Sequence, residues 1–334
     1  MTYRLSLLEK SLIPQGSTAA EALHRTTQLA QRAEALGYYR FWLNEHHGNH
    51  QLAGVAPEIL IAYLLARTSS IRVGSGGVML QHYSPFKVAE TFKLLASLAP
   101  GRVDLGVGKA PGGLPATTRA LQSRHDKQRP TAFDDLLAEL GHFLDDSLPE
   151  EHPLAGAIAH PVPPLPPARI LLGASTGSAE TAARLGWDFC YAGHFNGDPV
   201  NVSRSLRVFR EASGRSPLLA LFAFVAETQE EAQRLAGAKQ MVKLHLSTGQ
   251  SVNLPTQEAA AEFAHAVGDT AYRTELLTPH VIAGTAEQVR AELDALHERH
   301  GVDEFLVEMP VPDYAARLTS IELLAGALVP AAAN

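Results

Sequence analysis

One short pattern recurs three times along this chain of 334 residues and limits the folds that are open to it. Each copy starts at the end of an amphipathic stretch, passes through a glycine and finishes in an apolar run, at residues 34–43, 184–191 and 299–307. A glycine at the end of a helix can take the left-handed conformation that stops it. The apolar runs are too continuous for a sheet with one face in water. The pattern therefore predicts helix–strand units around a buried parallel sheet.

Five further apolar runs bring the number of predicted strands to eight. The predicted strands are residues 4–8, 40–43, 71–75, 103–106, 170–172, 189–191, 218–225 and 305–307. Amphipathic helices fit the gaps, for example at residues 19–36. Eight such units favour a closed (β/α)8 TIM barrel, formed by residues 1–334 as a single domain. The alternative is an open doubly wound sheet, but the glycine-rich dinucleotide turn typical of that fold is missing after the first strand.

Residues 240–279 separate the seventh and eighth predicted strands and are too many for a simple loop. We expect a partly helical insertion over the barrel mouth. Substrate selection would depend on it and on the loop after Gly112.

Composition excludes several classes of protein. The net charge is −7, and no basic run interleaved with aromatic residues could follow a phosphate backbone, so no nucleic acid is expected as a partner. The single cysteine, Cys190, rules out an internal disulfide and a cysteine-based metal site, and fits a small buried strand residue. The first ten residues do not resemble a signal peptide, and no apolar segment is long enough to span a membrane. A cytoplasmic protein with no membrane partner is expected.

Reactive groups of such barrels lie just beyond the carboxyl ends of the strands. Four groups of residues occupy such positions here: Asn44, Glu45, His46 and His47 after the second strand, Gly76 and Gly77 after the third, Lys109 after the fourth, and Ser175, Thr176, Gly177 and Ser178 after the fifth. All four groups are therefore expected on one face of the barrel.

The histidine pair is open to three interpretations. It could be an ordinary polar loop, a set of acid–base groups or, with His50 and His82, part of a metal site. Adjacent residues that leave a strand point in opposite directions, so His46 and His47 are poorly placed to bind one ion together. The late strand ends add no second histidine pair or aspartate. The sequence therefore predicts no metal site.

The turn from Ser175 to Ser178 precedes a predicted helix and combines hydroxyls, a glycine and the free N–H groups of a first helical turn. This is what a phosphate monoester needs, although plain N-capping would use the same serines. Lys109 could add a cation to the phosphate or be a solvated lysine. The run Gly74 to Met79 could let a flat ligand lie against the backbone, or form a tight turn. Together the groups suggest a phosphorylated planar cofactor.

Four ordered motifs carry a family resemblance: residues 41–47, 71–80, 101–108 and 175–178. With these motifs the chain resembles the bacterial luciferase-like, flavin-dependent monooxygenases, and most closely their short single-chain bacterial members. The resemblance runs from residues 17–22 to residues 284–289.

The resemblance implies FMN as the cofactor, used as reduced FMN from a separate flavin reductase, with O2 as co-substrate and one oxygen atom inserted into a small organic substrate. A flavin C4a-hydroperoxide would be the oxidant, and the protein would position it and exclude water. His46 aligns with the catalytic acid or base of the family. Gly76–Gly77 aligns with a non-prolyl cis peptide under the flavin ring, and Ser175 and Ser178 align with phosphate ligands. Asn44, Thr176 and Gly177 complete the expected cofactor site, and a homodimer is implied by the family alone.

Two positions depart from the family pattern. Lys109 stands where relatives often have an arginine, so a point charge replaces a bidentate clamp. His82 lies in a segment that more usually contains an asparagine, and we expect it to be a surface loop residue. Two other functions stay open: hydride transfer with a deazaflavin (F420) on the same scaffold, and flavin binding without catalysis.

Overall fold

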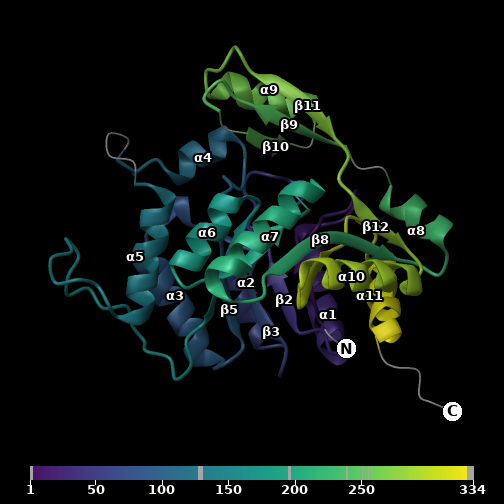
Figure 1. Ribbon diagram of the computed structural model, residues 1–334, viewed down its shortest axis with the longest axis horizontal. Coiled ribbons are helices and arrows are strands. Elements are labelled where there is room, and N and C mark those ends of the chain that lie inside the picture. The colour runs from purple at the N-terminus through teal and green to yellow at the C-terminus, as the bar shows by residue number, and fades with distance from the viewer. Residues whose placement is uncertain are drawn as a thin grey trace.

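Eight parallel strands close into a barrel in the order β1-β2-β3-β5-β6-β7-β8-β13, with β13 paired to β1 and β7 paired to β8 (Figure 1). The structure is a computed structural model that describes residues 3–126, 131–194, 197–237, 240–249, 251–254 and 256–328. The barrel strands are β1 (Arg4–Glu9), β2 (Arg40–Leu43), β3 (Arg72–Ser75), β5 (Val103–Gly108), β6 (Ala168–Gly173), β7 (Asp188–Ala192), β8 (Leu218–Val225) and β13 (Glu304–Glu308). The predicted barrel and its eight strands are confirmed.

Helices surround the barrel and connect successive strands. The main ones are α1 (Ala19–Ala35), α2 (Pro57–Leu65), α3 (Pro85–Leu98), α5 (Phe133–Asp145), α6 (Thr176–Arg184), α7 (Pro199–Ser213), α10 (Ala286–His300) and α11 (Tyr314–Leu328). Shorter elements are β4 (Val78–Met79), the 3-10 helix η1 (Leu80–His82), α4 (Pro115–Leu121), α8 (Gln229–Ala236) and β12 (Val281–Gly284). Gly37, Gly186 and Gly301, which end three of the helices, have φ of +80°, +73° and +55°. Their left-handed conformation was predicted from the repeated pattern.

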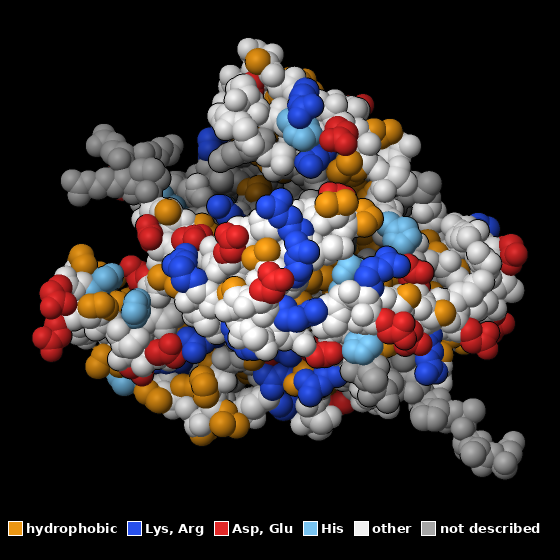
Figure 2. All heavy atoms as spheres, viewed as in Figure 1, with side chains coloured by type: hydrophobic (Ala, Val, Ile, Leu, Met, Phe, Trp, Pro, Cys, Tyr) orange, Lys and Arg blue, Asp and Glu red, His pale blue; other side chains and the backbone are white. Residues whose placement is uncertain are grey.

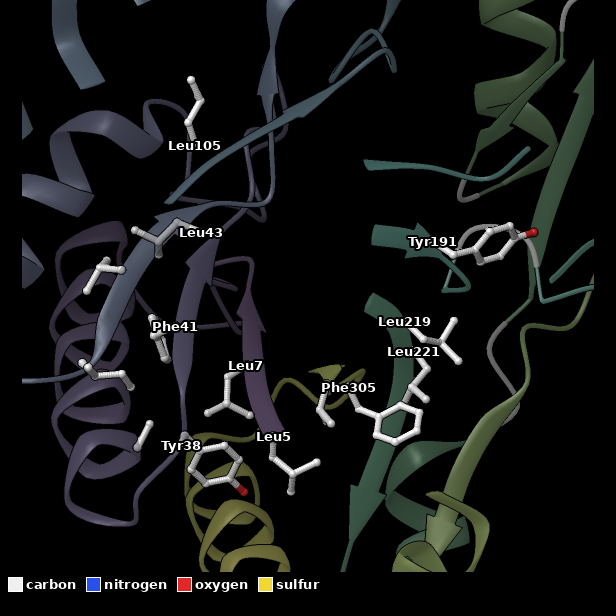
Figure 3. Close-up of a cluster of buried hydrophobic side chains, with 14 of the residues drawn as sticks. Leu5, Leu7, Tyr38, Phe41, Leu43, Leu105, Tyr191, Leu219, Leu221 and Phe305 are labelled. Carbon is white, nitrogen blue, oxygen red and sulfur yellow. The ribbon is translucent and has the colours of Figure 1, made fainter. Parts of the chain in front are cut away.

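Alternate residues of each strand face the two sides of the barrel wall. Odd-numbered residues such as Leu7, Phe41 and Leu221 belong to a large core shared with the helices, part of which is shown in Figure 3. Even-numbered residues such as Leu8 and Trp42 form a second apolar cluster inside the barrel. Cys190 is fully buried in this inner cluster, as predicted. The strands read as continuous apolar runs because both faces are covered.

Charged residues close the barrel interior at the amino ends of the strands. Arg40 donates to both oxygens of Glu304, at 2.7 and 3.1 Å. Asp104 accepts from Trp42 Nε1 at 2.9 Å and from Arg72 at 2.5 and 2.9 Å. Each buried carboxylate therefore has charged partners, as buried charges require. Ion pairs at the amino ends of the strands serve stability, and the carboxyl ends of the strands are the usual place for chemistry.

The segment between β8 and β13 contains a small antiparallel sheet of β9 (Met241–His245), β10 (Ser251–Leu254) and β11 (Arg273–Leu277), with α9 (Gln257–Ala266) beside it. It projects from the rest of the molecule in Figures 1 and 2. Leu114, which follows the carboxyl end of β5, packs against its apolar cluster. A partly helical insertion over the barrel mouth was expected at residues 240–279; the segment contains one helix and also a three-stranded sheet, which was not expected. Within the described residues no helix is long and apolar enough to cross a membrane.

Candidate active site

The segment after β2 carries the histidine pair. Glu45 is buried, and its carboxylate accepts hydrogen bonds from Tyr83 Oη at 2.8 Å and from the Met79 N–H at 3.1 Å. His47 Nε2 lies 2.7 Å from the same carboxylate. His47 is thereby engaged with Glu45, which ties the end of β2 to β4 through Met79 and to the end of η1 through Tyr83. Of the two adjacent imidazoles, His47 is therefore the one that bonds Glu45.

His46 is partly buried at the barrel mouth, where its backbone N–H donates to the Gly54 carbonyl at 2.9 Å. Burial, reinforced by the nearby Lys10 ammonium, lowers the pKa of His46 to about 4. The ring is therefore neutral at pH 7, with one nitrogen able to accept a proton and the other able to donate one. This is the state that a general base needs before reaction.

Three residues from distant parts of the chain form a charged group beside His46, which we call the mouth cluster: Lys10, His194 and Glu308. Lys10 Nζ forms an ion pair with Glu308 Oε1. His194 Nε2 lies 3.8 Å from Glu308 Oε2. Burial opposes ionisation of Glu308, but the charge and hydrogen bond of Lys10, together with the nearby imidazoles of His194 and His46, outweigh it and hold the pKa of this carboxyl below its ordinary value. Burial lowers the pKa of His194 to about 4.

Sequence reasoning missed the mouth cluster, although a signal was present. Lys10, His194 and Glu308 each stand at or within two residues of the end of a strand. The rule that selected His46 applies equally to them. Pairing of β1 with β13 sets Leu8 opposite Glu308, which brings Lys10 close to a residue almost three hundred positions away.

The peptide bond between Gly76 and Gly77 is cis, as the family resemblance implied. A Cβ atom on Gly76 would lie 2.5 Å from Leu8 Cδ1 inside the barrel, and one on Gly77 would lie 2.8 Å from the Gly106 carbonyl oxygen. Both contacts are closer than real Cβ atoms allow. The β5 backbone therefore excludes a side chain at Gly77, whereas a side chain at Gly76 would require the tip of the Leu8 side chain to move.

The predicted phosphate turn starts α6. Ser175 is the N-cap, and its hydroxyl accepts from the Ser178 N–H at 3.3 Å and lies 3.2 Å from the Ser178 hydroxyl. Thr176 and Gly177 occupy the first turn, whose N–H groups have no partner within a helix. Two hydroxyls and these N–H groups meet at the positive end of the helix dipole, so a dianion would be stabilised here.

Asn44 and Lys109 differ in their surroundings. The Asn44 side chain is buried, yet its Oδ1 finds no hydrogen-bond donor among the described residues. An unpaired buried acceptor is costly unless a ligand supplies the donor. Lys109 is exposed, with Nζ 5.8 Å from the centre of the Phe133 ring. No hydrogen bond or ion pair joins Lys109 to Ser175 or Ser178 in the described part of the chain.

His82 is not the surface loop residue that we expected. Its side chain is buried; Nε2 lies 2.8 Å from the Pro111 carbonyl oxygen, and Nδ1 lies 3.1 Å from Gln122 Nε2. The ring thus fastens the loop after β5 to η1. The sequence could not predict these contacts of His82, because Pro111 and Gln122 lie about thirty to forty residues further along the chain.

The described residues include no group of three or more histidine, cysteine, aspartate or glutamate side chains that could hold a metal ion. His47 Nε2 bonds Glu45, and Lys10 and Glu308 are the main charges that act on His46.

Comparisons with known proteins agree with this geometry. The family model described as luciferase-like monooxygenase matches residues 5–304. An N-acetyl-S-alkylcysteine monooxygenase of Bacillus subtilis (strain 168) is 42% identical over 332 residues, which cover 98% of this chain and 99% of that protein. A luciferase-like monooxygenase of Escherichia coli (strain K12) is 34% identical and covers 96% of each chain.

A solved structure supports the same assignment. The crystal structure of apo-MsnO8 matches with a TM-score of 0.76 at 36% identity and covers 97% of this chain and 98% of that chain. Both the family match and the relatives span nearly the whole chain, as the four sequence motifs implied. The chain belongs to the luciferase-like monooxygenase family and, with it, to the flavin-type monooxygenase enzymes.

Proposed function

We propose that this protein uses reduced FMN, supplied by a separate flavin reductase, to insert one atom of O2 into a small organic substrate. The second oxygen atom leaves as water, and reduced FMN provides the two electrons. The observation that carries the proposal is the neutral imidazole of His46 at the carboxyl end of the barrel, the same end at which Gly76–Gly77 and the Ser175 to Ser178 turn stand.

The residues present fit FMN. The hydroxyls of Ser175 and Ser178, with the N–H groups of Thr176 and Gly177, would hold the phosphate. Asn44 Oδ1, the buried acceptor without a donor, would pair with an N–H of the flavin ring. The side-chain-free peptide of Gly76 and Gly77 would support the ring, and Lys109 would add long-range attraction for the phosphate rather than a clamp.

His46 would hold or move a proton next to the reacting atoms. A general base or acid of this kind typically contributes 10²- to 10⁴-fold to the rate. The fixed pair of Glu45 and His47 would keep the end of β2 rigid, so that His46 stays in place.

For the substrate we propose an S-substituted, N-acylated cysteine. The Bacillus subtilis relative named as acting on N-acetyl-S-alkylcysteine is 42% identical along nearly the whole of both chains. Such a substrate has a free carboxylate and a thioether. The apolar ring of Phe222 beside the mouth cluster suits the S-substituent.

The experiment supplies the purified protein with FMN, a flavin reductase, NADH, ¹⁸O2 and N-acetyl-S-benzylcysteine. The expected product carries one ¹⁸O atom, and His46→Asn lowers product formation per NADH consumed while FMN binding persists. Ser178→Ala should weaken FMN about tenfold and leave riboflavin unchanged, because only FMN has the phosphate. Ser97→Ala, in which the lost hydroxyl bonds only within α3, is the matched control.

Two results would contradict the proposal. Failure to bind either oxidised or reduced FMN removes its basis, and binding of a deazaflavin in place of FMN favours hydride transfer. Equal loss of FMN and riboflavin in Ser178→Ala removes the phosphate role from this turn.

We further propose a homodimer that joins through α2 and α3. These neighbouring helices expose large apolar side chains one turn apart: Ile59 and Tyr63 on α2, and Leu94 and Leu98 on α3. Ile59 and Leu98 are 67% and 68% exposed. Several large apolar side chains exposed on two neighbouring helices are typical of a contact with another protein.

A further inference from the structure

We propose that Lys10 is the residue that recognises the substrate, by binding its carboxylate at the barrel mouth. The inference rests on the function proposed above and assigns a specificity-determining residue within that site.

The first argument is access. Lys10 and Glu308 form an ion pair, but their side chains are unequally covered, at 23% and 4% exposure. Of the two side chains, that of Lys10 is therefore the more accessible to a small molecule that enters the mouth. An ammonium has three N–H donors, of which Glu308 Oε1 engages one.

The second argument is that Lys10 is the cation next to His46, whereas the other buried cations are bound elsewhere. Arg40 and Arg72 are held by carboxylates at the opposite end of the barrel, and Arg317 pairs with buried Glu9. Lys93 is bound to Asp146. Among the described lysines and arginines, Lys10 is the one whose charge acts on His46.

The third argument is charge balance. With His46 and His194 neutral, Lys10 and Glu308 leave the site without net charge. An incoming carboxylate beside buried groups is costly unless a cation meets it directly. Lys10 Nζ also lies 5.7 Å from the centre of the Phe222 ring, so a ligand on Lys10 would place apolar groups against that ring.

The test compares N-acetyl-S-benzylcysteine with its primary carboxamide, which keeps the shape and the thioether but has no negative charge. The measurement is kcat/KM for oxygenated product in the complete system with reductase and FMN. The wild type should favour the acid on the order of 10- to 100-fold, as expected for a charge-assisted contact. In Lys10→Met the ratio of acid to amide should fall to about one, because any general loss from the changed surroundings of His46 and Glu308 is shared by both substrates.

Two further variants keep the test decisive if Lys10→Met does not fold. Lys10→Arg retains the cation and should retain the preference for the acid. Lys10→Met combined with Glu308→Gln removes both charges, so no unpaired carboxylate is left buried, and it should show no preference. Lys87→Met, which removes an exposed lysine on α3, is the matched control.

Equal losses for acid and amide in Lys10→Met, or a wild type that does not distinguish them, would overturn the inference. If the wild type oxygenates neither thioether yet binds FMN, the inference and the proposed substrate fail while the proposed use of FMN stands. Absence of binding to both oxidised and reduced FMN would instead refute the proposed function itself.

Discussion

Replacing His194 by glutamine removes a buried imidazole from the barrel mouth and should make the protein less sensitive to acid. In the unfolded chain a histidine takes up its proton near pH 6.5. In the folded protein burial lowers the pKa of His194 to about 4. Between these two values the unfolded chain binds more protons than the folded one, so stability that is present above pH 6.5 is lost as the pH falls.

The magnitude follows from the two pKa values. Between pH 8 and pH 5, one such histidine costs the folded state about 2 kcal/mol, and the full cost below pH 4 is about 3 kcal/mol. Glutamine has no proton to gain in this range. The loss of unfolding free energy from pH 8 to pH 5 should therefore be smaller in His194→Gln than in the wild type by about 2 kcal/mol.

Urea unfolding at both pH values, followed by circular dichroism, measures this difference. Comparing the change with pH, and not the stability itself, cancels any general defect of the variant at pH 8. His50→Gln, which replaces an exposed loop histidine, should behave as the wild type does. Equal pH sensitivity in His194→Gln and the wild type would show that His194 is already charged in the folded protein.

Two further predictions concern the barrel and its surface. Asp104→Asn should lower the free energy of unfolding by about 3–5 kcal/mol, because it leaves Arg40 and Arg72 without their shared carboxylate. Asp145→Asn, which breaks an exposed ion pair, is the control and should lower it by less than about 1 kcal/mol. Urea titration measures both values. Ile59→Asp should shift the protein from dimer to monomer in light scattering after size exclusion, and an unchanged mass would place any dimer contact elsewhere.

The barrel could be predicted because its local signals agree with one another. In the sequence, Gly37, Gly186 and Gly301 each stand between an amphipathic stretch and an apolar run. In the structure each of these glycines has a left-handed conformation between a helix and a buried barrel strand. The insertion was harder to predict. Buried and half-buried residues alternate along β9, a readable strand pattern, but β11 is almost fully exposed and is held by its pairing with β9. Long-range hydrogen bonds of that kind leave no trace in local hydropathy.

At Gly76 and Gly77 the structure gives a second reason for glycine beside the one that the sequence suggested. The sequence suggested that Gly76 and Gly77 leave room for a flat ligand. The structure adds a requirement that is independent of any ligand, since a Cβ on either residue would strike Leu8 or the backbone of Gly106. Such contacts form between strands that are far apart in the sequence, so composition could not reveal them.

The mouth cluster could have been found only by combining two rules. One is that reactive groups stand at the carboxyl ends of barrel strands, which selects Lys10, His194 and Glu308 along with His46. The other is the alternation of side chains across the wall, which directs even-numbered residues inward, as Leu8 and Trp42 are. Since Lys10 continues the inward series of β1, and Glu308 that of β13, closing the barrel must bring the two together. A closed barrel therefore turns separate strand-end residues into one site, and the polar residues at its inward positions are the first to test for substrate recognition.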